Sequence, residues 1–476
     1  MLLLSAIALT FATAAKAPPP RWWSPGDGRV FPEKFAYPNA YGSLGVQLSG
    51  GPMATKGHPF FSPLGPDGRA CVTCHQPADS MSLSAATAQD RWTATNGRDP
   101  LFAAYDGSDC PTLPQAKRSS HSLLLDHGLI RIERPWPVKG ADFTIDVVRD
   151  PNGCNSGAYG PQSGKISVYR RPRPIANMKY LLAIGFAYDP KAGMPVPVDP
   201  ETGQPVSGNL TADRRALTLK AQMQDAAQTH LQMTVNLRPD QIKAIVDFET
   251  RVYSAQMTGP FGRLDADGAE GGPSNLLQSP AGRLNGAAYP VWAEYSAWAN
   301  DNPKLGPDER AFRLSVARGA KTFREKTFLI TDSAGINGPV GFGNPVRNSC
   351  AFCHNMTQMG NDVAPGQVDL GTTNQPFADP APHFPLFRIT CQGQPHRHYG
   401  RVIMTSDPGF ALTTGKCADV GKITLQSNRG LAARAPYFSN GSAKDLRGVI
   451  EYYDRRYSIH YTEQEKQDLV NLLSVL

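Results

Sequence analysis

The sequence predicts a mainly α-helical protein of two domains with long loops and a few short strands, and three observations carry this prediction. A Cys-x-x-Cys-His motif occurs twice, at residues 71–75 and 350–354, far apart in the chain. A length of 476 residues is enough for two or three domains with cores of their own. The 45 glycines and 42 prolines favour short helices joined by loops, because both residue types interrupt regular elements.

Each motif predicts the covalent attachment of one c-type haem. In Cys-x-x-Cys-His the two thiols bond to one haem, and the adjacent imidazole becomes the proximal ligand of its iron. A redox disulfide or half of a zinc site is the alternative for a Cys-x-x-Cys pair. The predicted haem-binding residues are Cys71, Cys74, His75, Cys350, Cys353 and His354. The separation of the motifs predicts two cytochrome c-type haem domains, with His75 and His354 as metal ligands.

Residues 1–15 predict a signal peptide. Residues 1–11 are mostly apolar and precede Ala12, Thr13, Ala14 and Ala15, the small residues of a cleavage site. A positively charged start is missing. An uncleaved anchor is the alternative, although the stretch is shorter than the roughly 20 apolar residues that span a bilayer. We therefore expect a periplasmic protein with no stable membrane insertion.

Four cysteines lie outside the motifs, two in each half of the chain. They are Cys110, Cys154, Cys391 and Cys417. Because thiols of exported proteins can oxidise, we expect one disulfide in each half, Cys110 with Cys154 and Cys391 with Cys417. Other pairings and free thiols remain open at this stage.

The formal net charge of +7 comes from basic residues that are mostly scattered. Residues 170–173, Arg-Arg-Pro-Arg, form the one tight basic run, for which a solvated loop is favoured over an anionic docking patch. The chain contains no nucleic-acid-binding motif that we recognise, so we expect no nucleic-acid partner.

The predicted N-terminal haem domain, residues 16–256, begins with an arm rich in Pro, Gly and aromatic residues that extends to about residue 60. The first motif follows a Gly-Pro-Asp-Gly turn signal and should open a short helix. Further along, the sequence predicts a helical turn at 122–126, strands at 143–148 and 166–169 that we expect to pair as a small hairpin, and helices at 212–233 and 241–256.

Residues 257–290 are predicted as a linker, because residues 265–273 offer almost nothing to bury. The C-terminal haem domain is then expected over 291–476. Its predicted helices span residues 307–325, 446–453 and 463–476, and Thr462 with Glu465 forms a capping box for the last one.

With both motifs in hand, the chain resembles the bacterial di-haem cytochrome c peroxidase and MauG superfamily. The resemblance also rests on residues 317–323, Ala-Arg-Gly-Ala-Lys-Thr-Phe, and on the run 429–442, and it extends through 452–456. It covers most of the chain from about residue 60. It implies two covalently bound c-type haems, the one on His75 reacting with peroxide and the one on His354 transferring electrons. It also implies a calcium ion between the domains, for which the sequence offers no ligand set.

The resemblance places Tyr453 where classical peroxidases have a methionine ligand of the second haem. Packing of the Tyr453 ring is the alternative. Met404, His398 and His460 are competing ligand candidates.

For the distal side of the first haem, the classical displaceable histidine soon after the motif is missing. His121 and His127 are the next histidines, and Glu133 is the carboxylate candidate for proton transfer, since peroxide cleavage requires a proton carrier. Each of the three has an ordinary structural role as its alternative.

These residues predict a periplasmic di-haem oxidoreductase with cytochrome-c-peroxidase-like activity. Hydrogen peroxide is reduced at the N-terminal haem, and a small cytochrome c or cupredoxin supplies electrons through the C-terminal haem. The alternatives are the oxidation of an organic or protein substrate, as in MauG or the rubber oxygenases, and a non-enzymatic di-haem electron carrier.

Overall fold

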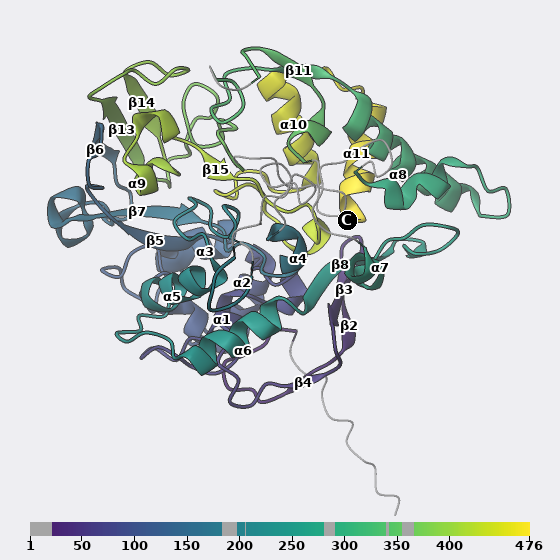
Figure 1. Ribbon diagram of the computed structural model, residues 1–476, viewed down its shortest axis with the longest axis horizontal. Helices are drawn as coiled ribbons and strands as arrows, with labels where there is room; N and C mark the ends of the chain where they lie inside the picture. The colour runs from purple at the N-terminus through teal and green to yellow at the C-terminus, as the bar shows by residue number, and fades with distance from the viewer. Residues whose placement is uncertain (1–20, 183–197, 205, 280–290, 339–341, 355–365) are drawn as a thin grey trace, which may run out of the picture.

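The computed structural model describes residues 21–182, 198–204, 206–279, 291–338, 342–354 and 366–476 (Figure 1). Of these residues 32% are helical and 18% are in strands or bridges. The prediction of a mainly α-helical fold is therefore wrong, because several antiparallel sheets accompany the helices. The predicted signal peptide at 1–15 and residues 280–290 of the predicted linker lie outside the described residues.

The helices are short, as the glycine and proline content predicts. The α-helices are α1 Cys71–Cys74, α2 Ala85–Thr95, α3 Ser122–His127, α4 Met178–Leu181, α5 Leu219–Thr229, α6 Pro239–Glu249, α7 Pro273–Gln278, α8 Pro307–Glu325, α9 Ala411–Thr414, α10 Leu446–Tyr457 and α11 Glu463–Ser474. The helix predicted over 307–325 is confirmed, and so is the capping box of Thr462 and Glu465 at the start of α11. The short helix predicted at the first motif is α1.

A four-stranded sheet joins the N-terminal arm to a distant segment. Its strands are β2 Lys34–Asn39, β3 Gly42–Leu48, β8 Val252–Gly259 and β9 Gly262–Arg263, in the order β2-β3-β8-β9. The helix predicted over 241–256 is thus wrong in its second half, because α6 ends at Glu249 and β8 pairs with β3 along its whole length. Gly42 permits this pairing, since a Cβ there would lie 2.1 Å from the Thr258 carbonyl oxygen.

Two further sheets replace the predicted hairpin. Strand β5 Ile130–Pro135 pairs with β7 Lys165–Arg170, whereas β6 Phe143–Arg149 pairs with β13 Leu386–Cys391, which also pairs with β14 Val402–Thr405. The two predicted strands exist, but they belong to different sheets. Strand β13 comes from the second half of the chain, and Figure 1 shows it beside β6.

Three two-stranded pairs complete the strands. They are β1 Val30–Phe31 with β4 Met53–Ala54, β10 Phe328–Ile330 with β11 Val346–Asn348, and β12 Gln367–Val368 with β15 Ile423–Thr424.

The apolar core divides into three main clusters. One lies around the four-stranded sheet with α5 and α6, and a second lies around α8, α10 and α11. The third combines side chains of β5, β6 and β7 with side chains of β13 and β14. The described part of the predicted linker contains β9 and α7 and buries Leu264 and Leu276. The predicted domain boundaries stay a prediction.

Helices α8 and α11 approach closely at Gly319. A Cβ at Gly319 would lie 2.2 Å from the Asp468 carbonyl oxygen, so a larger side chain would push the two helices apart. The buried Asp468 carboxylate accepts hydrogen bonds from Arg318 at 2.8 Å and from the Ser315 hydroxyl at 2.6 Å. This contact holds α8 in place. The Phe323 ring of α8 lies against His354 of the second Cys-x-x-Cys-His motif.

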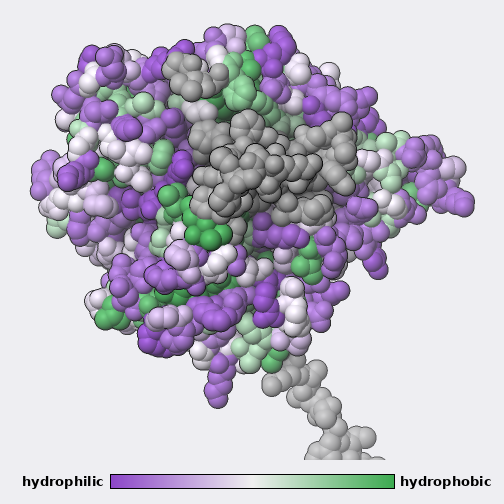
Figure 2. All heavy atoms as spheres, viewed as in Figure 1, coloured by the Kyte–Doolittle hydropathy of each residue, from purple (hydrophilic) through white to green (hydrophobic). Residues whose placement is uncertain are grey.

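Both predicted disulfides are confirmed. Cys110 bonds to Cys154 and Cys391 bonds to Cys417. No helix among the described residues is long and apolar enough to cross a membrane. Hydrophilic side chains cover most of the face shown in Figure 2, outside the segments drawn in grey.

Candidate functional site

The first cavity surrounds the motif at residues 71–75. Cys71, Cys74 and His75 all line it. Helix α1 is held in place at its C-terminal end, because Arg91 donates to the Thr73 carbonyl at 2.6 Å and pairs with Asp99. The two thiols and the imidazole therefore face one cavity.

The imidazole of His75 is oriented for a metal. Its Nδ1 lies 3.0 Å from the Met81 carbonyl oxygen, to which it donates as Nδ1–H, so Nε2 keeps its lone pair. Burial lowers the pKa of His75 to about 4, which keeps the ring neutral. A metal-binding histidine is commonly fixed by such a bond from its other nitrogen.

Several ionisable groups lie among the mostly apolar residues that line the first cavity. His230 Nδ1 lies 2.7 Å from Asp106 Oδ2, and its Nε2 lies 3.5 Å from Arg215 Nη2. Glu249, on α6, also faces the cavity, and its buried Oε2 has no hydrogen-bond partner among the described residues. Burial raises the pKa of Glu249 to about 8, so this carboxyl group is protonated at neutral pH.

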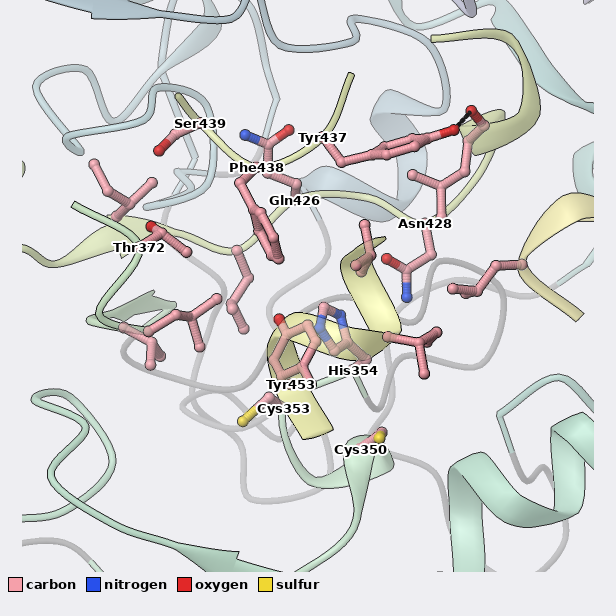
Figure 3. Close-up of a pocket in the computed structure, with 18 of the residues that line it drawn as sticks. Cys350, Cys353, His354, Thr372, Gln426, Asn428, Tyr437, Phe438, Ser439 and Tyr453 are labelled. Atoms are coloured by element: carbon pink, nitrogen blue, oxygen red, sulfur yellow. Dashed lines mark hydrogen bonds between the residues drawn. The ribbon is translucent and has the colours of Figure 1, made fainter. Parts of the chain in front are cut away.

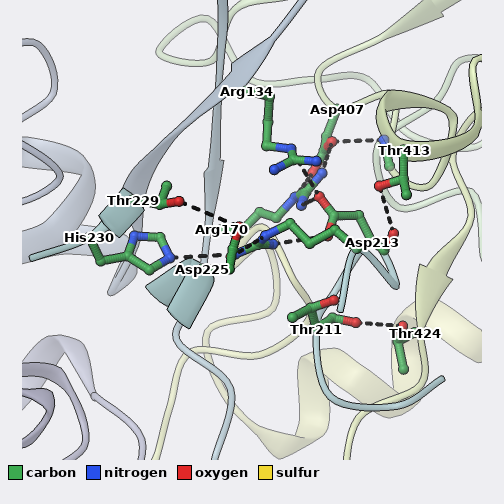
Figure 4. Close-up of polar contacts among 12 residues, drawn as sticks. Arg134, Arg170, Thr211, Asp213, Asp225, Thr229, His230, Asp407, Thr413 and Thr424 are labelled. Atoms are coloured by element: carbon green, nitrogen blue, oxygen red, sulfur yellow. Dashed lines mark hydrogen bonds and ion pairs between the residues drawn. The ribbon is translucent and has the colours of Figure 1, made fainter. Parts of the chain in front are cut away.

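Arg215 pairs with Asp213, which belongs to a buried polar cluster that Figure 4 shows together with Arg170 and Asp407. The Asp213 carboxylate pairs with Arg215 at 2.9 Å and with Arg170 at 2.7 Å, and Arg170 pairs with Asp407 at 2.6 Å. Because Asp407 follows β14, this chain of ion pairs connects the second half of the sequence to the wall of the first cavity.

The second cavity surrounds the motif at residues 350–354 (Figure 3). Cys350, Cys353 and His354 line it. Figure 3 shows the two thiols at one end and Tyr437, Phe438 and Ser439 at the other. The remaining wall is mostly apolar and aromatic. None of the described residues that line this cavity is an Asp or a Glu.

The residues of both cavities fit a haem better than the alternatives of a zinc site or a redox disulfide. The four motif cysteines are not disulfide-bonded. Across the described residues, no group of three or more His, Cys, Asp or Glu side chains could hold a metal ion, so no ligand set for the expected calcium is found among them.

Of the candidate ligands for the second haem, only Tyr453 lines the second cavity. Burial, with Tyr457 as the next cause, raises the pKa of Tyr453 well above its usual range. Met404 belongs to the edge strand β14, and His398 contacts Asp332 and the Asn337 carbonyl instead. His460 is exposed and does not line the cavity.

The three predicted distal residues do not line the first cavity. His121 is buried with Nδ1 and Nε2 at 2.7 and 2.8 Å from the carbonyl oxygens of Gly107 and Gln115, which leaves neither nitrogen for iron. His127 stacks on His383 with ring centroids 4.4 Å apart.

Glu133 lies in an ion-pair network instead. It pairs with Lys165 at 2.9 Å and with Arg131 at 3.4 Å, and it accepts from the Tyr105 hydroxyl. Burial alone would raise its pKa, but the Lys165 hydrogen bond and the Arg131 charge lower it. A carboxylate stabilised in this way is a poor proton donor near neutral pH.

The structure brings Asp106, His230 and Glu249 to the first cavity, and the sequence analysis missed all three. No motif marks them, because the tertiary fold brings them to residues 71–75 from distant parts of the chain. One signal was available, since Glu249 follows apolar residues at helical spacing and continues the buried face of α6.

No family model matches the chain, and no curated protein is similar to it. Among solved structures, the chain is similar to the crystal structure of a MauG-like protein associated with microbial copper homeostasis. The two sequences are 17% identical, the alignment covers 59% of this chain and 76% of that chain, and the TM-score is 0.29. This similarity to a MauG-like protein is distant, so the function of the cavities has to be argued from their own residues.

Proposed function

We propose that the chain is a c-type di-haem oxidoreductase that reduces hydrogen peroxide in the first cavity with electrons delivered through the second. One observation carries the assignment of roles. Both cavities contain the same motif, but Asp106, His230 and Glu249 line the first, whereas no Asp or Glu, and no histidine besides His354, is among the described residues that line the second. Reduction of peroxide to two waters consumes two protons and two electrons, and only the first cavity contains an acid–base set.

A haem bound by Cys71, Cys74 and His75 would supply an iron that binds peroxide and accepts electrons. The Asp106 carboxylate accepts the Nδ1–H of His230 and thereby fixes the tautomer in which Nε2 is the basic nitrogen. The 3.5 Å contact from Arg215 to Nε2 is at the limit of a hydrogen bond, so Nε2 can exchange that contact for a proton from the substrate. Glu249 adds a protonated carboxyl group to the same wall.

The second cavity suits electron transfer. A haem held there by Cys350, Cys353 and His354 would supply an electron-transfer centre in a mostly apolar and aromatic wall, and Tyr453 is a further residue that could hold it. The donor proposed for it is a small cytochrome c or cupredoxin. The two disulfides support a periplasmic location, since disulfides persist in oxidising compartments.

The first experiment is a haem count by the pyridine haemochrome spectrum, followed by low-temperature EPR of the oxidised protein. We expect two haems, one high-spin and one low-spin. Two low-spin haems without peroxide turnover would favour an electron carrier, and dioxygen binding by the reduced protein would favour a MauG-like or rubber-oxygenase-like oxidation.

Stopped-flow turnover with a reduced donor then tests the residues. We expect His230→Gln to slow peroxide reduction by about 100-fold or more, the range of general acid–base catalysis, without loss of haem. His383→Gln is the matched control, because His383 stacks on His127 outside both cavities. Equal rates for His230→Gln and the control would remove His230 from the mechanism. His75→Gly should abolish turnover and spare the spectrum of the second haem.

A further inference from the structure

Arg171 lines both cavities, and Arg434 lines the second. Both side chains are buried, with 6% and 4% of their surface exposed. The sequence analysis predicted that the basic run at residues 170–173 is a solvated loop. The structure instead buries Arg170 and Arg171, so this run contributes charge to the interior.

The guanidinium groups of Arg171 and Arg434 hydrogen-bond to backbone carbonyls. Arg171 donates to the carbonyls of Arg434 and Leu83, both at 2.6 Å, and its Nε has no partner among the described residues. Arg434 donates to the carbonyls of Ser427 and Arg429. Within the described part of the chain, neither arginine takes part in an ion pair.

Asp79, the carboxylate that acts on Arg171, does not pair with either arginine. The Asp79 carboxylate influences Arg171 electrostatically, but its oxygens accept hydrogen bonds from Ser84 and Thr87. Burial and the neighbouring Arg434 lower the pKa of Arg171 to about 9, and burial lowers the pKa of Arg434 to about 10. Two buried like charges without an anion destabilise the fold, unless a ligand supplies the missing negative charge.

We propose that Arg171 and Arg434 form a carboxylate-binding site between the two cavities, occupied by the propionate groups of the haems. This proposal rests on the proposed di-haem function. A haem carries carboxylates on the edge opposite its vinyl groups, and the second cavity offers them cations but no acidic residue. Arg171 lines both cavities, so it would supply positive charge to both haem sites, whereas Arg434 would supply it to the second site alone.

The test is the midpoint reduction potential of each haem, measured by spectroelectrochemistry on the holoprotein. A positive charge near a haem disfavours its ferric form. We therefore expect Arg171→Gln to shift both ferric–ferrous equilibria about tenfold towards the ferric form, which is about 59 mV for one electron. Arg434→Gln should shift the second haem only. Arg171→Lys keeps the charge and should remain close to wild type.

A second readout follows from the carboxylates themselves. A propionate that loses its buried cation takes up a proton more readily, so the potentials of Arg171→Gln should become pH-dependent across the neutral range. Arg388→Gln is the matched control, because Arg388 pairs with Asp146 at the surface, where both side chains are 53% exposed.

The outcomes separate this proposal from the proposed function. A wild-type protein without two haems would refute the function itself. Two haems whose potentials respond to Arg171→Gln no more than to Arg388→Gln would refute only the carboxylate site. If Arg171→Gln does not fold, Arg434→Gln decides, since a shift confined to the second haem supports the site and an unchanged second haem overturns it.

Discussion

Asp213→Asn should destabilise the protein strongly, because it removes the central anion of a buried cluster. Asp213 is fully buried and pairs with Arg170 at 2.7 Å, with Arg215 at 2.9 Å and with Arg134 at 3.5 Å. Burial alone would raise the pKa of Asp213, but Arg215, Arg170 and Arg134 hold it far below its usual range. The side chain is therefore ionised in the folded protein throughout the neutral range.

The size of the effect follows from the charges that remain. In the variant, Arg170 keeps Asp407 and Arg215 keeps Asp225, but Arg134 loses its ion-pair partner. Breaking a buried ion pair from one side typically costs 3–5 kcal/mol, and we expect a loss of about 3 kcal/mol in the free energy of unfolding. Since the folded-state pKa is depressed, this stabilisation is present above about pH 4 and is lost as the pH falls further.

Urea unfolding of the holoprotein at neutral pH and near pH 3 measures both statements. The matched control is Asp301→Asn, whose partner Arg310 is at the surface, and there we expect a much smaller loss of stability. A loss for Asp213→Asn no larger than that of the control would refute the reasoning, and so would a difference from wild type that grows in acid.

Three further predictions concern other parts of the molecule. Glu249→Gln should have a larger free energy of unfolding than the wild type, by up to about 4 kcal/mol at pH 8. The folded-state pKa of Glu249 is raised, so the stability of the wild type falls between about pH 5 and pH 8, whereas that of the variant does not. Urea unfolding of both proteins at both pH values measures this difference. Replacing Cys110 and Cys154 by serine should lower the free energy of unfolding by about 4 kcal/mol, because their disulfide closes a loop with a sequence separation of 44 and so restricts the unfolded chain. Replacing Cys391 and Cys417, with a separation of 26, should lower it by about 0.5 kcal/mol less. Tyr453→Phe should change the absorption and EPR spectra of the second haem only, and unchanged spectra would leave Tyr453 as a packing residue.

The sequence predicted the elements that local patterns determine. Helix α8 begins with Pro307 at its first position and has a continuous amphipathic pattern, and α11 has a local capping box. The disulfides were predicted correctly, since each pair lies within one half of the chain.

The fold class was not predictable in the same way, because strand pairing is non-local. Strand β8 directly follows α6 and continues its apolar composition, so that only its pairing with β3 distinguishes it from a helix. Strand β6 finds its partner β13 in the other half of the chain, a pairing that no local pattern specifies. The residues that line the cavities could not be predicted for the same reason, since His230 and Asp106 become neighbours only in the folded chain.

The two haem motifs are equivalent in chemistry, so the roles of the haems must come from what surrounds them. His75 shares its cavity with two carboxyl groups and a second histidine, whereas the described wall around His354 contains tyrosines, apolar side chains and two arginines but no carboxyl group. We therefore propose proton-coupled reduction of peroxide at the first site and transfer of electrons alone at the second. This assignment predicts opposite phenotypes for the two proximal ligands. His354→Gly should leave peroxide binding by the first haem intact while slowing turnover from an external donor, whereas His75→Gly should abolish peroxide binding. The reverse pattern in stopped-flow spectra would exchange the two roles.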